Sequence, residues 1–227
     1  MEGPTPVSAL IHAATMVTAG IFLLLRAAFI FTASPKVQLA IVVVGVVTAV
    51  LSAISAMFVF DLKKIIAYST CSQIGYMAVA CGIAQYNIAF FHLINHAFFK
   101  ALLFLTAGAV IHSCSNEQDI RKLSNIFPGM PLIYVAFLVG NIAIMGFPFI
   151  SGFYSKDLII EFCFLGADSV WVFWTYAGQA LFIGVLGATI CTGLYSFRLV
   201  YFLFLRSGVR HKISLMRSVQ LQPMFIR

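Results

Sequence analysis

The hydrophobic positions of this chain fall into long runs separated by short polar segments. A transmembrane helix needs about 20 mostly apolar residues, because the hydrocarbon core of a bilayer is about 30 Å thick. The runs approach or exceed that length, and the segments between them leave no room for a separate soluble domain. The pattern therefore predicts an all-α, polytopic membrane helix bundle with six spans. The predicted spans are residues 6–31, 37–60, 65–83, 87–111, 130–165 and 170–205.

The fifth run, residues 130–165, is too long for one straight crossing and is interrupted near its middle. Gly146, Pro148 and Gly152 stand at the interruption, and both residue types disfavour a helix interior. Backbone groups freed by such a break are tolerated at membrane depth only where protein buries them or where they line a cavity. We therefore expect a discontinuous helix here, a feature that points to ion sites in transport proteins.

Composition supports the membrane assignment. Hydrophobic residues make up 62% of the 227 residues and charged residues 9%, whereas soluble domains carry about 25% charged residues. The formal net charge of +7 would suggest nucleic acid in a soluble protein, but the Lys and Arg residues gather in loops and in the tail. We expect contact with membrane lipids and no nucleic acid. The five cysteines form no Cys-x-x-Cys pair, so neither a metal site nor a disulfide is predicted.

The basic residues also predict an orientation. With six crossings, ten Lys and Arg residues fall on one side of the membrane, and two, Arg26 and Lys36, fall on the other. This asymmetry obeys the positive-inside rule and supports the number of spans. We expect a transmembrane domain at residues 1–205 and a basic C-terminal tail at 206–227. The ten residues are Lys63, Lys64, Arg121, Lys122, Arg198, Arg206, Arg210, Lys212, Arg217 and Arg227.

Titratable residues line one face of the fourth span. His92, His96 and Lys100 recur at every fourth position, so a helix places them in one row with steps of about 6 Å. Their neighbours are mostly Phe, Leu and Ile, and a lysine at the centre of such a helix costs about 2.5–3.5 kcal/mol on insertion scales. Three desolvation costs on one face favour a proton-exchanging role over a purely structural one.

Lys156 and Asp157 follow shortly after the helix break. Two interpretations stay open: Lys156 is a titrating site near the positive end of the second half-helix, or it forms an ion pair with Asp157 that pins the kink. His12 in the first span either titrates or simply hydrogen-bonds a neighbouring helix. Lys63, two residues after Asp61, reads as part of a solvated turn with a helix cap.

Four stretches of the sequence, in order and spacing, resemble a known family. They resemble the chain 5 family of antiporter-like subunits in the respiratory NADH:ubiquinone oxidoreductase (complex I), which is similar to the large subunits of Mrp-type cation/proton antiporters. The resemblance covers nearly all residues from 2 to about 205. The stretches are EGPTPVSALIHAATMV at 2–17, DLKKIIAYSTCSQIGY at 61–76, HAFFKALLF at 96–104 and GFYSKD at 152–157.

The resemblance implies how the chain is built and used. Family members contain two inverted five-helix repeats, each with one broken helix, and pass protons along buried Lys, His and Glu residues with water between them. The present chain resembles the second repeat, and we expect a separate chain to supply the N-terminal half of chain 5. The residues that fall on the family's proton path are His12, Lys63, His92, His96, Lys100 and Lys156.

The resemblance also implies a proton-translocating subunit of the membrane arm, which belongs to an enzyme only as part of NADH:ubiquinone reductase. Other membrane-arm subunits are the expected partners. No cofactor is expected on this chain, since NADH, FMN, iron–sulfur clusters and ubiquinone bind in other parts of the complex. The expected location is the mitochondrial inner membrane, with basic loops and C-terminus on the matrix side, or a bacterial plasma membrane. A stand-alone Mrp-type cation/proton antiporter subunit and a structural remnant of the membrane arm stay open as alternatives.

Overall fold

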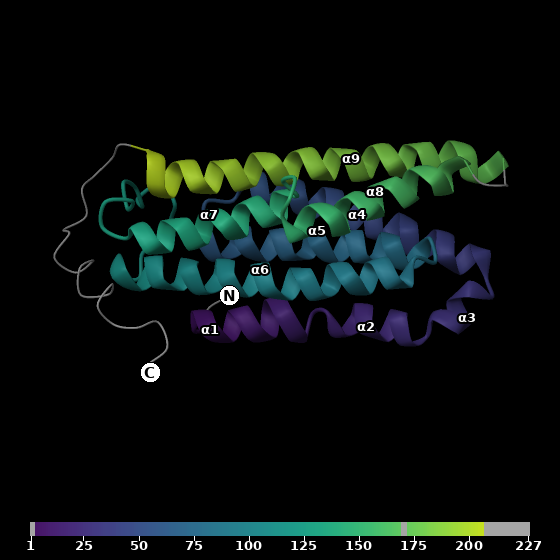
Figure 1. The fold of residues 1–227 in the computed structure, drawn as a ribbon, viewed down its shortest axis with the longest axis horizontal. Coiled ribbons are helices and arrows are strands. Elements are labelled where there is room, and N and C mark those ends of the chain that lie inside the picture. The colour runs from purple at the N-terminus through teal and green to yellow at the C-terminus, as the bar shows by residue number, and fades with distance from the viewer. Residues whose placement is uncertain (1–2, 169–171, 207–227) are drawn as a thin grey trace.

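The computed structural model describes residues 3–168 and 172–206, and every regular element within those ranges is helical. Figure 1 shows long helices lying side by side, and the order of the elements takes the chain across the bundle six times. The predicted all-α bundle with one discontinuous helix is confirmed. From the second crossing onward the elements are α4 (Pro35–Phe58), α5 (Leu62–Gly82), α6 (Tyr86–Ser113), α7 (Pro131–Met145), α8 (Ser151–Asp168), α9 (Val172–Val200) and η2 (Tyr201–Leu205).

The first crossing is less regular than the single helix that the sequence predicts. The Thr15 hydroxyl donates to the carbonyl oxygen of Leu10 at 2.8 Å, and the Thr18 hydroxyl donates to that of Ala14 at 2.7 Å. Such bonds to the preceding turn compete with the α-helical ladder and bend helices. The crossing is accordingly divided into α1 (Thr5–Val7), the π-helical segment η1 (Ser8–Thr15), α2 (Ala19–Arg26) and α3 (Ala28–Thr32).

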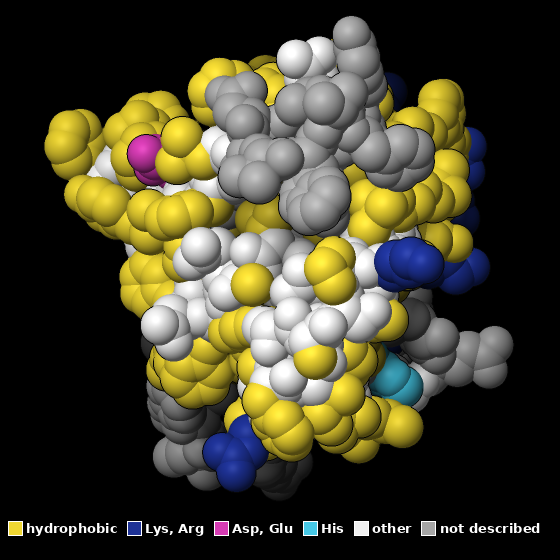
Figure 2. Space-filling model, turned by 90° about the vertical axis from the view of Figure 1, so that its right-hand side faces the viewer, with side chains coloured by type: hydrophobic (Ala, Val, Ile, Leu, Met, Phe, Trp, Pro, Cys, Tyr) yellow, Lys and Arg dark blue, Asp and Glu magenta, His cyan; other side chains and the backbone are white. Residues whose placement is uncertain are grey.

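Among the described residues, four stretches of helix are long and apolar enough to cross a membrane by length and composition. They are Thr5–Arg26, Pro35–Phe58, Tyr86–Ser113 and Gly178–Leu205. α5, which buries many polar residues, and the pair of shorter helices α7 and α8 complete the six crossings. Large hydrophobic side chains such as Phe29, Phe98 and Leu132 are exposed on the outside of the described helices. In Figure 2, which looks at one end of the bundle, hydrophobic side chains are common and charged ones are few among the described residues.

Small residues allow α4 and α5 to approach closely. A Cβ added to Gly75 would lie 2.7 Å from the backbone nitrogen of Ala49, and one added to Gly45 would lie 2.9 Å from that of Val79. Only glycine permits such a contact between backbones. Because α5 also contacts α6, α8 and α9, this packing places its polar residues at the centre of the bundle.

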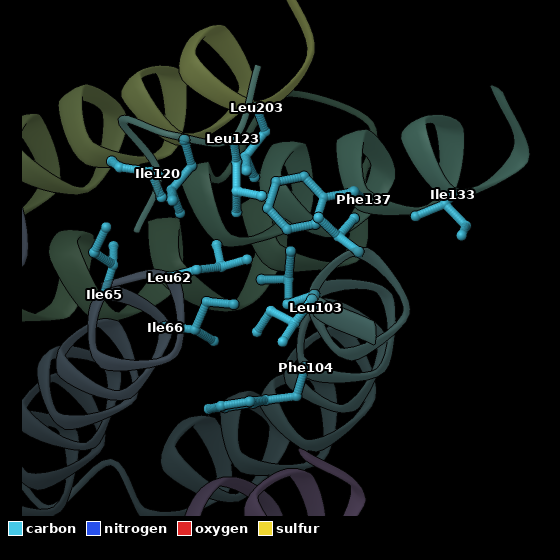
Figure 3. Packing of buried hydrophobic residues seen from close by; sticks show 14 of the residues in the cluster. Leu62, Ile65, Ile66, Leu103, Phe104, Ile120, Leu123, Ile133, Phe137 and Leu203 are labelled. Atoms are coloured by element: carbon cyan, nitrogen blue, oxygen red, sulfur yellow. The ribbon is translucent and has the colours of Figure 1, made fainter. Parts of the chain in front are cut away.

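A hydrophobic cluster closes the end of the bundle where α5 begins and α6 ends. The side chains that Figure 3 labels come from α5, α6, α7, η2 and the connection after α6, and further members come from η1, α4 and α9. Close packing of this kind leaves no room for water. The labelled members are Leu62, Ile65, Ile66, Leu103, Phe104, Ile120, Leu123, Ile133, Phe137 and Leu203.

Polar contacts fasten the connections at the same end, which we call the loop end. Asp61 caps α5 by accepting a hydrogen bond from the backbone N–H of Lys63 at 3.0 Å. An isolated antiparallel bridge pairs Asp61 with Asp119. Hydrogen bonds from the Arg121 guanidinium lower the pKa of the Asp119 carboxyl to about 2, so this ion pair persists throughout the physiological pH range.

The discontinuity lies between α7 and α8. Gly146 follows α7 in the left-handed conformation, with φ of 79°, which glycine adopts without a Cβ clash. Pro148 lies in the connecting residues, and Ser151 begins α8. Gly152 passes directly over the end of α7, since a Cβ there would lie 1.8 Å from the carbonyl oxygen of Ala143. The three residues that interrupt the sequence pattern thus occupy or border the break.

The close approach at Gly152 generates a prediction. Gly152→Ala should destabilise the bundle by about 1–3 kcal/mol, the usual cost of overpacking, because the backbone of α7 or α8 must shift to admit the methyl group. Thermal unfolding of the detergent-solubilised protein measures the effect. Gly187→Ala in α9 is the matched control, since a Cβ there has no heavy atom within 4 Å. Equal melting temperatures for the two variants would contradict the described contact.

Candidate functional site

Four titratable side chains are buried together inside the bundle. The exposed fraction is 0% for His96 and Lys100, 1% for His92 and 3% for Lys156. The first three lie on one face of α6, and the fourth lies on α8, which packs against α6. The row that the sequence places on one face of the fourth span therefore points into protein and not toward lipid. We call these four residues the central group.

Lys100 is held by the first half of α5. Its Nζ donates to the Ser69 hydroxyl and, at 3.4 Å, to the carbonyl oxygen of Ile66. Both acceptors are neutral. The amine is thus solvated by polar groups of the neighbouring helix and not by a carboxylate.

His92 links three helices. Its Nε2 lies 3.1 Å from Gln73 Oε1 on α5, and its Nδ1 lies 2.8 Å from Ser155 Oγ on α8. Because a carbonyl oxygen only accepts, Nε2–H donates to Gln73. In the neutral ring Nδ1 then accepts from the Ser155 hydroxyl, and in the protonated ring Nδ1–H donates to it. Both nitrogens of this imidazole are therefore satisfied, and the ring orientation is fixed from two sides.

His96 differs from His92, although it lies one turn further along α6. Neither of its ring nitrogens has a hydrogen-bond partner among the described residues. Its ring meets Phe99 edge to face at 5.4 Å between centroids and lies 6.5 Å from the ring of His92. Buried polar atoms nearly always have a protein or water partner, so we expect ordered water beside this imidazole.

Lys156 lies in the second turn of α8 and reaches toward α9. Its Nζ donates to Thr192 Oγ1 at 2.8 Å and lies 5.1 Å from the centroid of the Tyr76 ring, within cation–π range. Asp157 is exposed, and no ion pair between described residues involves either of them. The structure therefore does not contain the pairing of Lys156 with Asp157. Side chains of adjacent residues on a helix point about 100° apart. Here Lys156 points into the bundle and Asp157 points to its surface.

The other two candidate residues lie away from the central group. Lys63 is buried at the loop end of α5, with an exposed fraction of 5%, and its Nζ donates to the carbonyl oxygen of Gly3 at 3.3 Å. Reading it as a solvated turn residue is wrong, because the start of the first crossing covers it. His12 is exposed on η1, so the described bundle does not bring it together with the other histidines.

Sequence reasoning missed the contribution of α9. Thr192, Tyr195 and Ser196 are buried in the bundle, and Thr192 binds the lysine of α8 directly. Tyr195 and Ser196 follow Thr192 by three and four residues. This spacing was an available signal, because it places the three polar groups on one face of an otherwise apolar span. On α5, by contrast, Ser69 and Gln73 face protein, as the polarity of that span predicts.

Crossing helices, one of them broken, around buried lysines and histidines define a polytopic membrane protein of antiporter-like architecture. Residues 1–184 match the family described as NADH:quinone oxidoreductase/Mrp antiporter, transmembrane region. The chain belongs to this family.

Individual relatives agree with this assignment. The chain is 50% identical over 215 residues to NADH-ubiquinone oxidoreductase chain 5 of Chondrus crispus, covering 95% of this chain and 32% of the relative. It is 52% identical over 205 residues to the protein of that name from Cryptococcus neoformans var. grubii, covering 90% and 30%. The chain thus spans about a third of the length of these relatives.

Solved structures show the same fold. A chain in the structure of the Mrp complex from Dietzia sp. DQ12-45-1b superposes with a TM-score of 0.78 and 33% identity, covering 96% of this chain and 24% of that chain. A chain of the membrane-bound sulfane sulfur reductase, an archaeal respiratory membrane complex, gives a TM-score of 0.75 and 25% identity, covering 96% and 44%.

The bond between Lys156 and Thr192 can be tested by removing one hydroxyl. Thr192→Val keeps the side-chain shape but leaves the buried amine without this acceptor, so thermal stability in detergent should fall by about 1–3 kcal/mol. Thr189→Val is the matched control, because its hydroxyl bonds only the Leu186 carbonyl oxygen of its own helix, and it should change stability by less than about 0.5 kcal/mol. If the two variants have the same melting temperature, the hydrogen bond between Lys156 and Thr192 does not stabilise the bundle.

Proposed function

We propose that this chain forms part of the proton-translocating membrane arm of an NADH:ubiquinone oxidoreductase and that protons move through it along buried lysines and histidines. The observation that carries this proposal is the central group, which is buried in a bundle of the NADH:quinone oxidoreductase/Mrp antiporter family. The hydrogen-bond partners of Lys100 and Lys156 are neutral hydroxyl and carbonyl groups. A proton on either amine is therefore not locked in place by an opposite charge.

The arrangement supports proton exchange through electrostatics. A buried ammonium is costly in a medium of low dielectric constant, and a positive charge on Lys100 disfavours a second positive charge on Lys156. A proton that arrives on one lysine therefore promotes release from the other. An imidazole can accept a proton at one ring nitrogen while it gives one up at the other, so His92 and His96 are suited to pass a proton between the lysines, with water bridging the gaps.

Lys63 and His12 extend the proposed path to the borders of the described bundle. Lys63 lies buried at the loop end, whereas His12 lies on the exposed side of η1. A polar side chain facing lipid is costly at membrane depth. We infer that the region forming the first repeat in this family covers η1, either within the same polypeptide or as a separate chain.

We place the chain in the mitochondrial inner membrane, among other membrane-arm subunits, with the loop end toward the matrix. The support is its 50% identity to chain 5 of Chondrus crispus and the concentration of basic residues at the loop end. No redox chemistry is assigned to this chain, because NADH, FMN, iron–sulfur clusters and ubiquinone belong to other parts of the proposed complex. An Mrp-type cation/proton antiporter is the second candidate, favoured by the TM-score of 0.78 with the Dietzia Mrp complex.

Substitution of Lys156 tests the proposed path. Lys156→Met keeps the length and packing of the side chain but removes its titratable group, so we expect normal assembly and a loss of proton pumping. NADH oxidation should fall in step if the two are tightly coupled. Pumping is measured in membrane vesicles with a pH-sensitive dye, and assembly is measured on native gels. Lys36→Met, which changes an exposed lysine at the opposite end from the loops, should leave both unchanged.

Lys156→Arg separates a proton relay from a fixed charge. A guanidinium remains protonated at physiological pH, so this variant should assemble and yet fail to pump. If the positive charge served only to hold α8 in place, arginine would be tolerated and methionine would impair assembly. Full pumping by the arginine variant would falsify the relay role of Lys156.

Migration on blue-native gels separates the candidate functions. A membrane-arm subunit should migrate in a complex on the order of a megadalton that oxidises NADH, whereas a stand-alone antiporter should migrate in a small assembly. Mass spectrometry of the same band should detect other membrane-arm subunits. Co-migration with the large complex, combined with normal pumping by all central-group variants, would instead support a structural remnant.

A further inference from the structure

Polar atoms without hydrogen bonds gather in the same part of the bundle interior as the central group. Among the described residues, the buried polar atoms that lack a hydrogen bond include the Tyr195 hydroxyl, Gln73 Nε2 and both ring nitrogens of His96. Ordered water usually satisfies such groups where protein cannot. The interior of this bundle therefore holds hydrogen-bonding capacity that its helix-to-helix contacts do not use.

Tyr195 has the most informative position in this set. It lies on α9, about one turn after Thr192. Its hydroxyl lies close enough to Ser69 and Gln73 of α5 to interact with both groups, although no hydrogen bond of good geometry joins it to either. Its side chain is almost fully buried. A tyrosine that served only to fill space would leave a polar atom in an apolar interior at a cost, whereas phenylalanine would fill the same space without that cost.

Both neighbours of this hydroxyl are bonded to members of the central group. Ser69 accepts a hydrogen bond from Lys100, and Gln73 accepts one from His92. Tyr195 therefore stands beside one group bonded to Lys100 and another bonded to His92. His96 lies between Lys100 and His92 on α6, but its ring bonds to neither within the described part of the chain.

We propose that Tyr195 is a proton-relay residue, which carries protons between Lys100 and Lys156 on a branch separate from His96. This inference rests on the proposed function. A hydroxyl suits the task because its oxygen accepts a proton while its own proton leaves on the other side. This branch ends near Thr192, which lies on the same helix as Tyr195 and accepts the hydrogen bond from Lys156 of α8.

The transfer leaves the intermediate groups unchanged. The ammonium of Lys100 gives one proton to the Ser69 oxygen. The original Ser69 proton, which otherwise bonds the Ile66 carbonyl oxygen, passes through water to the Tyr195 oxygen. The original Tyr195 proton then passes through water to the free amine of Lys156. Lys100 ends as a neutral amine and Lys156 ends as an ammonium, and only N–H and O–H bonds form or break.

Tyr195→Phe tests the proposal in the assembled complex, because it removes one oxygen that has no partner in the described protein. Assembly and melting temperature should stay unchanged, while proton pumping in vesicles should fall by about threefold to tenfold. This is less than the factor of about 10²–10⁴ that a positioned proton-transfer group typically contributes, because the branch through His96 remains. Ser196→Ala is the matched control. Its hydroxyl is also buried on α9 but already donates to the Thr192 carbonyl oxygen at 2.7 Å, so pumping should be unchanged.

The same vesicles distinguish failure of this inference from failure of the proposed function. If Lys156→Met lowers pumping and Tyr195→Phe does not, the relay role of Tyr195 is overturned and the proposed path stands without it. If neither variant changes pumping, the proposed function itself fails. A loss of pumping by Tyr195→Phe that is matched by a loss of assembled complex would assign Tyr195 a structural role and would also overturn the relay.

Discussion

The cost of burying an amine among apolar helices governs this structure. A lysine at the centre of a membrane helix costs about 2.5–3.5 kcal/mol on insertion scales, and a hydrogen bond involving a charged group contributes about 1.5–3 kcal/mol. Lys100 and Lys156 each donate to a hydroxyl on a neighbouring helix, Ser69 and Thr192 respectively. Because the two magnitudes are comparable, these hydrogen bonds offset much of the cost of keeping each amine inside the bundle.

Close packing brings these hydroxyls within reach of the amines. Gly45 and Gly75 let α4 and α5 touch backbone to backbone, which positions α5 as the central helix. Gly152 lets α8 start directly over the end of α7, and the second turn of α8 then carries Lys156 against α9. The broken helix thus places an amine beside hydroxyls that a straight helix would direct elsewhere.

The surroundings of Lys100 differ on its two sides. Toward the loop end lies the hydrophobic cluster of Figure 3, whose member Ile66 also supplies a carbonyl acceptor for the amine. On the side facing His92 lie the unpartnered polar atoms of His96, Gln73 and Tyr195. Water is favoured where polar atoms need partners and is excluded where side chains are apolar. The packing therefore favours water on the His92 side of Lys100 and disfavours it toward the loop end.

The sequence by itself determined the membrane spans, the break and the row of His92, His96 and Lys100. Hydropathy and a spacing of four residues are local properties. They predict the structure correctly because a helix has a fixed periodicity, which places residues four apart on the same face. The irregular first crossing shows the limit of this reasoning, since hydroxyl bonds to its own backbone disrupt a helix that its apolar composition predicts.

Only the tertiary structure decided which groups meet. The partner of Lys156 is Thr192, 36 residues away, and not the adjacent Asp157. Likewise, Lys63 is buried by the start of the first crossing, and Tyr195 faces α5. These contacts depend on how each helix is rotated about its axis and on which helices lie beside it. The glycine contacts and the helix break set both across the whole bundle. No local pattern encodes that rotation, so only the packed bundle reveals the polar neighbours of each lysine.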